Sequence, residues 1–248
     1  MAARLLAGKG YTVVLLARSM DKLEAVAGEI RATGGSAHAY SVDLSQAADA
    51  EAVCAKVVAD VGVPHVLLNN AGAGIWKEIE ATSMAENQQM MSVPYFAAFN
   101  ATRGFIDGML AENRGHIINV TSPAAVLPIP GAVSYGVARW AMRGFSEALY
   151  GDLYHTKVAV TMYCPGHVDT PYFANNPGSL ERIPAIDKII PLLTEEKAAR
   201  HVLKIVRRRP REYYAPWLVG FFAWCHRMFP WMVNMVVIHT GWRRARKT

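Results

Sequence analysis

A hydroxyl, a phenol and a cation follow one another at spacings that could support acid–base chemistry. The apolar run 115–120 is followed by Thr121 and Ser122, Tyr135 lies thirteen positions after Ser122, and Arg139 follows Tyr135 by four. A helix places residues four apart on one face, and open α/β sheets bind ligands beyond the carboxyl ends of their strands. Such groups can exchange a proton with a carbonyl or alcohol during hydride transfer. We expect the three side chains to meet across an open crevice.

The elements that must position these groups alternate between strands and helices. Expected strands cover residues 11–16, 37–42, 66–68, 115–120, 158–163 and 212–216, with helices between them and one long helical region over 85–111. The run 11–16 is continuously apolar, which is typical of a strand buried on both faces of a parallel sheet. The alternation predicts an α/β fold with a doubly wound, Rossmann-like parallel sheet.

Three further motifs follow expected strands. They are Asp43-Leu44 after 37–42, Asn69-Asn70-Ala71-Gly72 after 66–68, and Pro165-Gly166-His167-Val168-Asp169-Thr170 after 158–163. Together with the serine and the Tyr-x-x-x-Arg pair, they resemble the short-chain dehydrogenase/reductase family, whose pattern is Ser followed by Tyr-x-x-x-Lys. The resemblance covers roughly residues 1–215.

The resemblance implies an oxidoreductase that interconverts an alcohol and a ketone or aldehyde. Tyr135 would be the acid/base, Ser122 would orient the carbonyl, and Arg139 would be the cationic partner. Arg18 would stand near the cofactor ribose 2′ position, where arginine accommodates a phosphate, so we expect NADP, with NAD as the alternative. The residues expected to bind the cofactor are Arg18, Asp43, Leu44, Asn70, Ala71, Gly72, Tyr135, Arg139, Pro165, Gly166, Val168 and Thr170.

The sequence departs from the family pattern at its start. The family begins with a strand and a glycine-rich turn that cradles the cofactor pyrophosphate, whereas this sequence starts inside the helix that should follow. In the family's strand order 3-2-1-4-5-6-7, that strand separates the second strand from the fourth. Either those two strands pair directly, or the sequence is a fragment with Met1 an internal methionine, which is the alternative we favour.

Two substitutions within the pattern bear on activity. Arg139 replaces the family's lysine, and a guanidinium supplies the charge but cannot relay a proton. Pro94 stands where the family usually has an asparagine that kinks a helix, and proline also kinks a helix and keeps its carbonyl. We expect reduced activity. The alternative is a catalytically inert, membrane-associated binding or scaffold protein.

The last part of the chain has a different composition. We expect residues 1–216 to form the catalytic domain, with 171–192 as a substrate lid, and 217–248 to form a hydrophobic and basic extension. The aromatic-rich stretch 217–238 is interrupted by polar residues and Pro230, which argues against a simple span. Three alternatives remain open: a membrane-surface anchor, which we favour, a lid or dimer-packing helix, and a true span. An anchor implies a lipophilic small-molecule substrate.

Charge and cysteine content limit the classes of partner and cross-link that the sequence supports. The net charge of +6 is concentrated in Arg207-Arg208-Arg209 and Arg243-Arg244-Ala245-Arg246-Lys247, which flank the apolar stretch and favour an anionic membrane over nucleic acid. Three scattered cysteines imply no disulfide framework, and the histidines show no metal-ligand spacing. No secretory signal is evident. We expect a homo-oligomer in the cytoplasm, associated with membranes if the anchor forms.

Overall fold

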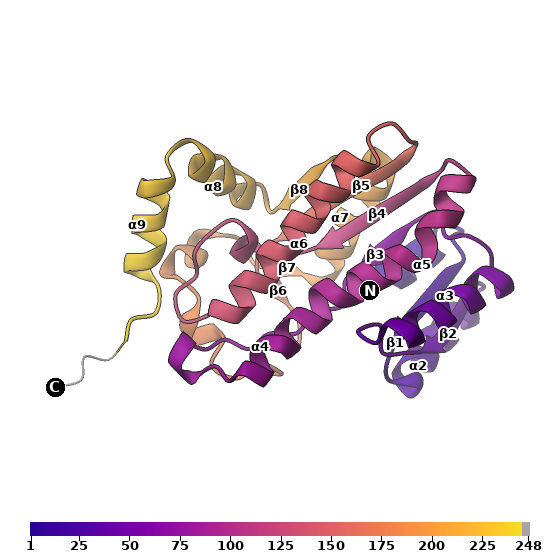
Figure 1. Ribbon diagram of the computed structural model, residues 1–248, viewed down its shortest axis with the longest axis horizontal. Coiled ribbons are helices and arrows are strands. Elements are labelled where there is room, and N and C mark those ends of the chain that lie inside the picture. The colour runs from indigo at the N-terminus through magenta and orange to yellow at the C-terminus, as the bar shows by residue number, and fades with distance from the viewer. Residues whose placement is uncertain (245–248) are drawn as a thin grey trace.

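The computed structural model describes residues 1–244, which form an α/β arrangement (Figure 1). The strands are β1 (Val13–Ala17), β2 (Ala37–Ser41), β3 (Leu67–Asn69), β4 (Gly115–Val120), β5 (Val158–Pro165), β6 (Val168–Asp169), β7 (Leu193–Thr194) and β8 (Glu212–Ala215). The α-helices are α1 (Ala2–Ala7), α2 (Met20–Ala32), α3 (Ala47–Asp60), α4 (Met84–Met91), α5 (Ala97–Ala111), α6 (Val133–Asp152), α7 (Glu195–Arg208), α8 (Trp217–Met228) and α9 (Pro230–Thr240).

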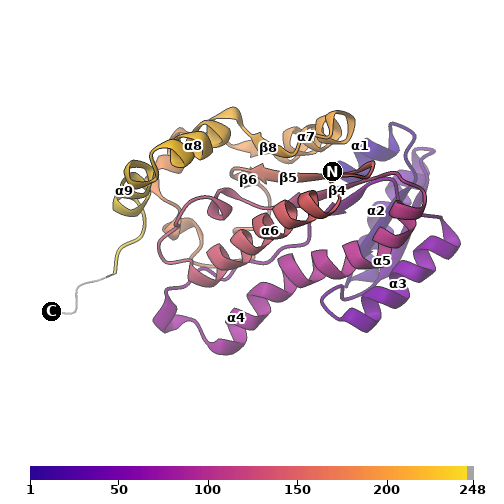
Figure 2. The same cartoon turned by 45° about the horizontal axis from the view of Figure 1, so that its top comes forward.

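The strands form parallel sheets between two layers of helices. One sheet has the order β3-β4-β5-β8, a second consists of β1 and β2, and β6 pairs with β7. Figure 2 shows α3, α5 and α6 on one side of the strands, with α1 and α7 on the other. The predicted Rossmann-like α/β fold is confirmed. Because the strands of each sheet run parallel, their carboxyl ends share one edge, where Ser122 follows β4.

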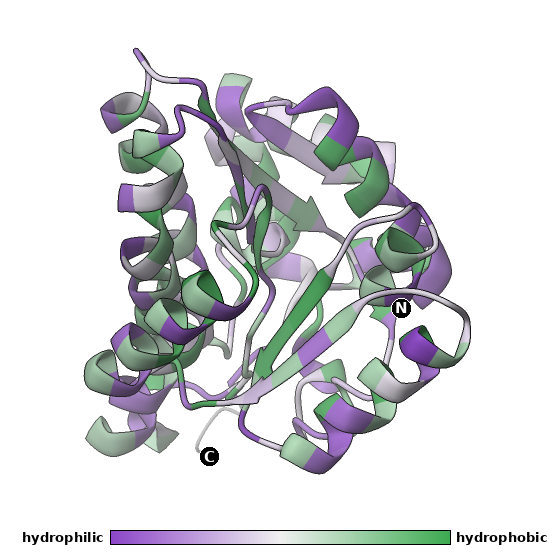
Figure 3. Ribbon diagram, turned by 90° about the vertical axis from the view of Figure 1, so that its right-hand side faces the viewer, coloured by the Kyte–Doolittle hydropathy of each residue, from purple (hydrophilic) through white to green (hydrophobic). Residues whose placement is uncertain are grey.

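Hydropathy explains these layers. The helices in Figure 3 carry both hydrophilic and hydrophobic segments, as expected where one face packs on a sheet and the other meets solvent. The main apolar cluster lies between the sheet and the α3–α5 layer, and it includes the fully buried Met109 and Ile117. This cluster also takes in partly buried residues of β1, which connects the two sheets through side chains.

The main sheet is interrupted between β1 and β3. Within the described residues, β1 pairs only with β2 and β3 pairs only with β4, so direct pairing of the second and fourth family strands does not occur. The first apolar strand packs on both faces as expected, with Val14 and Leu16 against one apolar cluster and Val13 and Leu15 against another, but its burial is incomplete. Val13, Val14, Leu15 and Leu16 are all partly exposed, because one edge of β1 lacks a neighbouring strand.

The long helical region 85–111 contains an irregular turn at the expected proline kink. A π-helical segment, Ser92–Phe96, joins α4 to α5, and Val93 has non-helical backbone angles of φ −113° and ψ 20°. Pro94 is buried, and its carbonyl accepts a hydrogen bond from the Ala97 N–H. Proline thus bends the helix, as the sequence predicts.

Two separate helices form the end of the described chain. The apolar stretch 217–238 breaks at Phe229, so α8 has 12 residues and α9 has 11. In residues 1–244, no helix is both long and apolar enough to cross a membrane. Figure 1 places the two helices, drawn in yellow, at the end of the molecule opposite β1 and β2. The basic cluster predicted at the end of the extension includes Ala245, Arg246 and Lys247, which lie outside the described residues.

The interrupted sheet predicts unequal local stability. Hydrogen exchange followed by mass spectrometry should show β1 and β2 exchanging at least about tenfold faster than β4 and β5, because an isolated two-stranded sheet is marginally stable. Strand β8 is the control, since it is also an edge strand but belongs to the four-stranded sheet. Equal protection of β1 and β4 would contradict the claim that the interruption between β1 and β3 lowers the local stability of β1 and β2.

Candidate active site

Ser122 is held at the carboxyl end of β4 by a short turn. The strand ends at Val120, and Ser122 caps the 3₁₀ turn Pro123–Ala125, where its Oγ accepts a hydrogen bond of 3.2 Å from the Ala124 N–H. Proline at the first position of this turn suits its fixed φ. The hydroxyl is therefore positioned by the backbone and only partly exposed.

Tyr135 meets Ser122 from the first turn of α6. Its Oη donates a hydrogen bond of 3.1 Å to Ser122 Oγ. Ser122 Oγ thus accepts from both Tyr135 and the Ala124 N–H, while its own hydrogen remains available to a further acceptor. An incoming carbonyl oxygen is such an acceptor, and it would then lie beside both hydroxyls.

Arg139 is a buried cation next to this pair. Its side chain is one helical turn from Tyr135, its guanidinium carbon lies 4.9 Å from the centroid of the Tyr135 ring, and the residue is 6% exposed. Nη2 donates to the Ala73 carbonyl at 3.3 Å, and Nε has no hydrogen-bond partner. A side chain at Gly72 would place its Cβ 2.9 Å from Nη2, so glycine makes room for the guanidinium.

The structure brings Ser122, Tyr135 and Arg139 together, but the expected open crevice is absent in front of the phenol. Tyr135 is only 5% exposed because Trp76 stacks on its ring, with centroids 4.5 Å apart. Tyr172 Oη accepts a hydrogen bond of 3.2 Å from Trp76 Nε1. Burial raises the pKa of the Tyr172 phenol, so it stays neutral in this contact. A substrate can reach Tyr135 only if these aromatic side chains move.

The segment 171–192 is fastened over the site by several contacts. Asn176 Oδ1 accepts from the Gly74 N–H at 2.9 Å, and Arg182 pairs with Glu78 at 2.9 Å. His167 Nδ1 lies 3.4 Å from Asp187 Oδ2, whose carboxyl pKa is raised by burial. The segment expected to form a lid thus contacts the loop that carries Gly74 and Glu78. Sequence reasoning missed Trp76 and Tyr172; their closeness to the motifs at 69–72 and 165–170 was the only available signal.

A buried amide network fixes the centre of the sheet beneath the site. Asn69 donates to Thr102 Oγ1 at 3.2 Å and to Asn119 Oδ1 at 2.8 Å, and Asn119 donates to Ser146 Oγ at 3.1 Å. Asn119 is fully buried. The network ties β3, β4, α5 and α6 together, so it fixes the register in which Ser122 and Tyr135 meet.

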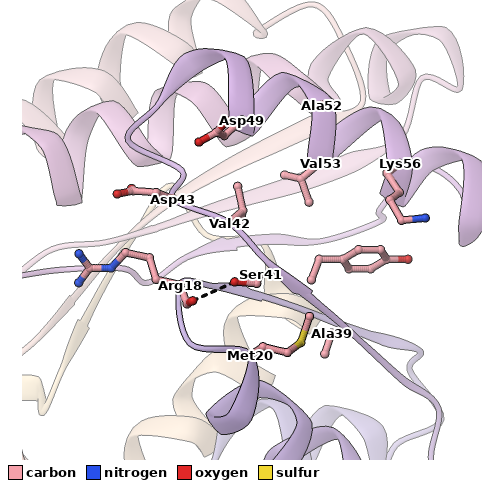
Figure 4. Close-up of a pocket in the computed structure, with 11 residues that line it drawn as sticks. Arg18, Met20, Ala39, Ser41, Val42, Asp43, Asp49, Ala52, Val53 and Lys56 are labelled. Atoms are coloured by element: carbon pink, nitrogen blue, oxygen red, sulfur yellow. Dashed lines mark hydrogen bonds between the residues drawn. The ribbon is translucent and has the colours of Figure 1, made fainter.

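An open hollow of about 800 Å³ lies at the carboxyl ends of β1 and β2 (Figure 4). It is lined by Arg18 and Asp43 among others, with Lys56 further along, and the Ser41 hydroxyl donates to the Arg18 carbonyl at 2.9 Å. Hydrogen bonds from Ser45, and then the nearby charge of Arg18, lower the pKa of the Asp43 carboxyl. Leu44 lies outside this hollow, and so do Ser122, Tyr135 and Arg139.

The remaining expected cofactor residues lie at neighbouring strand ends. Asn70, Ala71 and Gly72 follow β3 and are exposed. Pro165 ends β5, and the Gly166 N–H donates to the Ala215 carbonyl at 2.7 Å. Val168 begins β6, and Thr170 follows that strand; both are partly exposed. The orphaned Arg139 Nε and the uncovered 70–72 loop suit a ligand rich in hydroxyl oxygens, such as the ribose of a dinucleotide.

Comparison with known proteins gives one consistent family. The family model described as "short chain dehydrogenase" matches residues 1–179. An uncharacterized oxidoreductase of Mycobacterium tuberculosis is 35% identical over 228 residues, which is 90% of this chain and 64% of that protein. Estradiol 17-beta-dehydrogenase 11 of Homo sapiens is 27% identical over 211 residues, which is 84% of this chain and 67% of the relative. The chain therefore spans less than two thirds of the mycobacterial relative's length.

Solved structures give the same fold. An alcohol dehydrogenase from the archaeon Thermococcus sibiricus, complexed with 5-hydroxy-NADP, is 26% identical with a TM-score of 0.73, over 86% of this chain and 88% of that one. A metagenomic short-chain oxidoreductase in complex with NADP is 28% identical with a TM-score of 0.70, over 86% and 89% of the two chains.

The amide network predicts a large stability cost for a small change. Asn119→Ala should lower the free energy of unfolding by about 2–4 kcal/mol, because it removes the buried hydrogen bonds that join Asn119 to Asn69 and to Ser146 and leaves a cavity in their place. Urea denaturation monitored by circular dichroism measures this. Asn175→Ala, at an exposed position, is the control and should change stability by less than about 0.5 kcal/mol. Equal effects of the two substitutions would show that the network contributes nothing.

Proposed function

The chain belongs to the short-chain dehydrogenase family, and we propose that it interconverts an alcohol and a ketone or aldehyde with NADP(H). One observation carries the proposal: Tyr135 donates to Ser122, and the buried Arg139 lies beside the phenol with no carboxylate partner in the part of the chain that the structure describes. A structural ion pair would satisfy that guanidinium. This arrangement instead leaves one hydroxyl hydrogen and one guanidinium nitrogen available for ligands. The contacts do not favour the alternative of an inert scaffold.

The three side chains have separable roles in carbonyl reduction. Ser122 donates its free hydrogen to the substrate oxygen and holds it near Tyr135. Tyr135 transfers its phenolic proton to that oxygen as negative charge develops there. The positive charge of Arg139 then stabilises the phenolate; opposite charges about 5 Å apart attract by about 3 kcal/mol at an effective dielectric of about 20. In alcohol oxidation the same proton moves in the opposite direction.

The cofactor would be held at both ends by residues of this chain. Arg139, the loop 70–72 and the segment 165–170 would hold the nicotinamide riboside, and Arg18 and Asp43 would hold the adenosine. When bound, the nicotinamide supplies or accepts the hydride. Arg18 favours the 2′-phosphate of NADP because a guanidinium pairs with phosphate in a bidentate geometry. The NADP complexes among the solved relatives support the same preference, with NAD as the alternative.

We further propose a lipophilic substrate. A small apolar pocket adjoins the turn after Ser122 and is lined by Pro123, Val126 and Leu127 together with Ile190 of the lid. The name of the human relative, an estradiol dehydrogenase, points to the same substrate class. We also propose that the protein is cytoplasmic and that residues 1–216 form its catalytic domain. Residues 217–248 would then make peripheral contact with a membrane.

An apolar surface on the α5–α6 layer supports a homo-oligomer. Phe96, Phe99, Val137 and Trp140 are each about half exposed, with exposed fractions of 45%, 45%, 54% and 46%. Phe99 and Phe145, from the two neighbouring helices, lie 5.9 Å apart, so the surface is continuous across them. Aromatic residues are enriched at subunit interfaces. We assign this face to contact with a second copy of the chain.

Substitution of the phenol and of the guanidinium should have opposite effects on turnover. In NADPH-dependent reduction of a ketone panel, Tyr135→Phe should lower kcat by at least about 100-fold, because it removes the transferred proton. Arg139→Lys should raise kcat, because a smaller ammonium can also relay a proton. Arg143→Lys, one turn further along α6, is the matched control and should leave kcat unchanged. A lower kcat in Arg139→Lys would show that the guanidinium is itself the fitted group.

Cofactor choice should depend on Arg18. Arg18→Glu should weaken NADPH binding relative to NADH by at least about tenfold, because it replaces a phosphate partner with a repelling carboxylate. Fluorescence titration with both nucleotides gives the ratio of their dissociation constants. Lys56→Glu is the control, since Lys56 lines the same hollow but pairs with Asp60. An unchanged ratio in Arg18→Glu, or the same change in both variants, would refute a specific phosphate contact.

A further inference from the structure

Helix α8 presents a continuous aromatic face to solvent. Trp217, Phe221, Trp224 and Met228 recur at the spacing of one helical face and are 72%, 47%, 56% and 56% exposed. The Phe221 ring stacks on Trp224, with centroids 6.3 Å apart and planes inclined by 26°. The structure holds these rings together outside the apolar core.

Helix α9 extends this face. Trp231, Met235 and Ile238 are 69%, 47% and 48% exposed, and Met232 and Val236 are also exposed. The opposite side of the pair packs on the body of the protein through buried residues, which are Val219 and Ala223 of α8 and Val233 and Val237 of α9. His226 Nε2 lies 3.0 Å from Asn234 Oδ1, which links the two helices.

The sequence that forms this face and follows it carries cations and no carboxylate side chains. Residues 213–248 contain no aspartate or glutamate, but they contain five cations: Arg227, Arg243, Arg244, Arg246 and Lys247. In the described part of the chain, Arg227 pairs with Glu212 and Arg244 with Glu80, whereas Arg243 contacts only the His239 carbonyl. Trp residues beside cations are typical of a surface that meets anionic lipid headgroups.

The cluster Arg207-Arg208-Arg209 does not belong to this surface. It ends α7 ahead of β8, whereas α8 begins directly after that strand, so the strand separates the two. The two basic clusters flank the apolar stretch in the sequence, but β8 places residues 207–209 at its opposite end from α8.

We propose that the exposed face of α8 and α9, defined by Trp217, Phe221, Trp224, Met228, Trp231 and Met235, docks on the surface of an anionic phospholipid bilayer. Helices of 12 and 11 residues are each roughly 17 Å long, about half of the bilayer core, so they lie in the interface. Burial of indole rings and attraction of the cations to headgroups together provide the binding energy.

Docking would place a membrane next to the reaction site. The apolar pocket beside the turn after Ser122 is closed on its other side by Val219, Phe222, Val233 and Val237 of α8 and α9. A lipophilic ketone in the bilayer would thus reach the site from between these helices and the lid. This access route rests on the proposed oxidoreductase activity, whereas docking itself does not.

Flotation of the protein with vesicles tests docking without any substrate. The protein should float with phosphatidylcholine vesicles that contain phosphatidylserine and bind pure phosphatidylcholine more weakly, with a difference that high salt removes. The double variant Trp224→Gln/Trp231→Gln should lose at least about tenfold in vesicle affinity without loss of stability, since both residues are largely exposed. Met84→Gln, at a position 88% exposed on α4, is the control and should bind as the unaltered protein does.

Three results would overturn docking. Failure of the unaltered protein to float with vesicles, or equally strong flotation of the double variant, contradicts docking. Sedimentation velocity showing that the double variant changes only self-association would instead assign the face to a second copy of the chain. The route has its own readout: the double variant should raise KM for a ketone carried in vesicles but not for a water-soluble ketone. Vesicle binding without reduction of either ketone would refute the proposed function and leave docking intact.

Discussion

The site depends on the burial of a positive charge that has no carboxylate partner among residues 1–244. Removing a charge from water is costly, so Arg139 must be held by weaker partners: the Ala73 carbonyl, the face of the Tyr135 ring and the space left by Gly72. This requirement links the loop after β3 to the first turns of α6. It also keeps a cation beside a phenol whose hydrogen bond already points to Ser122. A ligand that supplies oxygen atoms to Arg139 would relieve the remaining cost.

The frame around this charge is rigid on one side and incomplete on the other. Asn69, Asn119 and Ser146 lock the four-stranded sheet to α6, which fixes the distance between the serine and the tyrosine. Beyond β3 the sheet stops, and β1 and β2 hold the Arg18 hollow as a separate pair of strands. The two ends of a dinucleotide site therefore rest on two sheets that are connected by side-chain packing and helices rather than by strand hydrogen bonds.

The spacing of apolar residues, and the glycine, proline and polar residues between the apolar runs, were enough to predict most of the fold. The apolar runs 37–42, 115–120 and 158–163 located the main strands. The spacing of four predicted that Tyr135 and Arg139 share a helical face, and the resemblance to the family pattern implied that Ser122 joins them. The cover over Tyr135 was not predicted, because Trp76 and Tyr172 come from loops 96 residues apart, and their contact depends on lid packing that has no local pattern. Likewise, the partial exposure of β1 follows from the strand neighbours, which a single run of residues does not encode.

Transfer of an isotopic label tests most directly whether the Ser122–Tyr135–Arg139 cluster works as an oxidoreductase site. NADPH carrying deuterium at the transferable C4 position would be incubated with the protein and a panel of lipophilic ketones, and the alcohols analysed by mass spectrometry. The account predicts alcohol that carries one deuterium, formed by the unaltered protein and lost in Tyr135→Phe. Recovery of every ketone unreacted, although binding of NADPH is demonstrated, would contradict it.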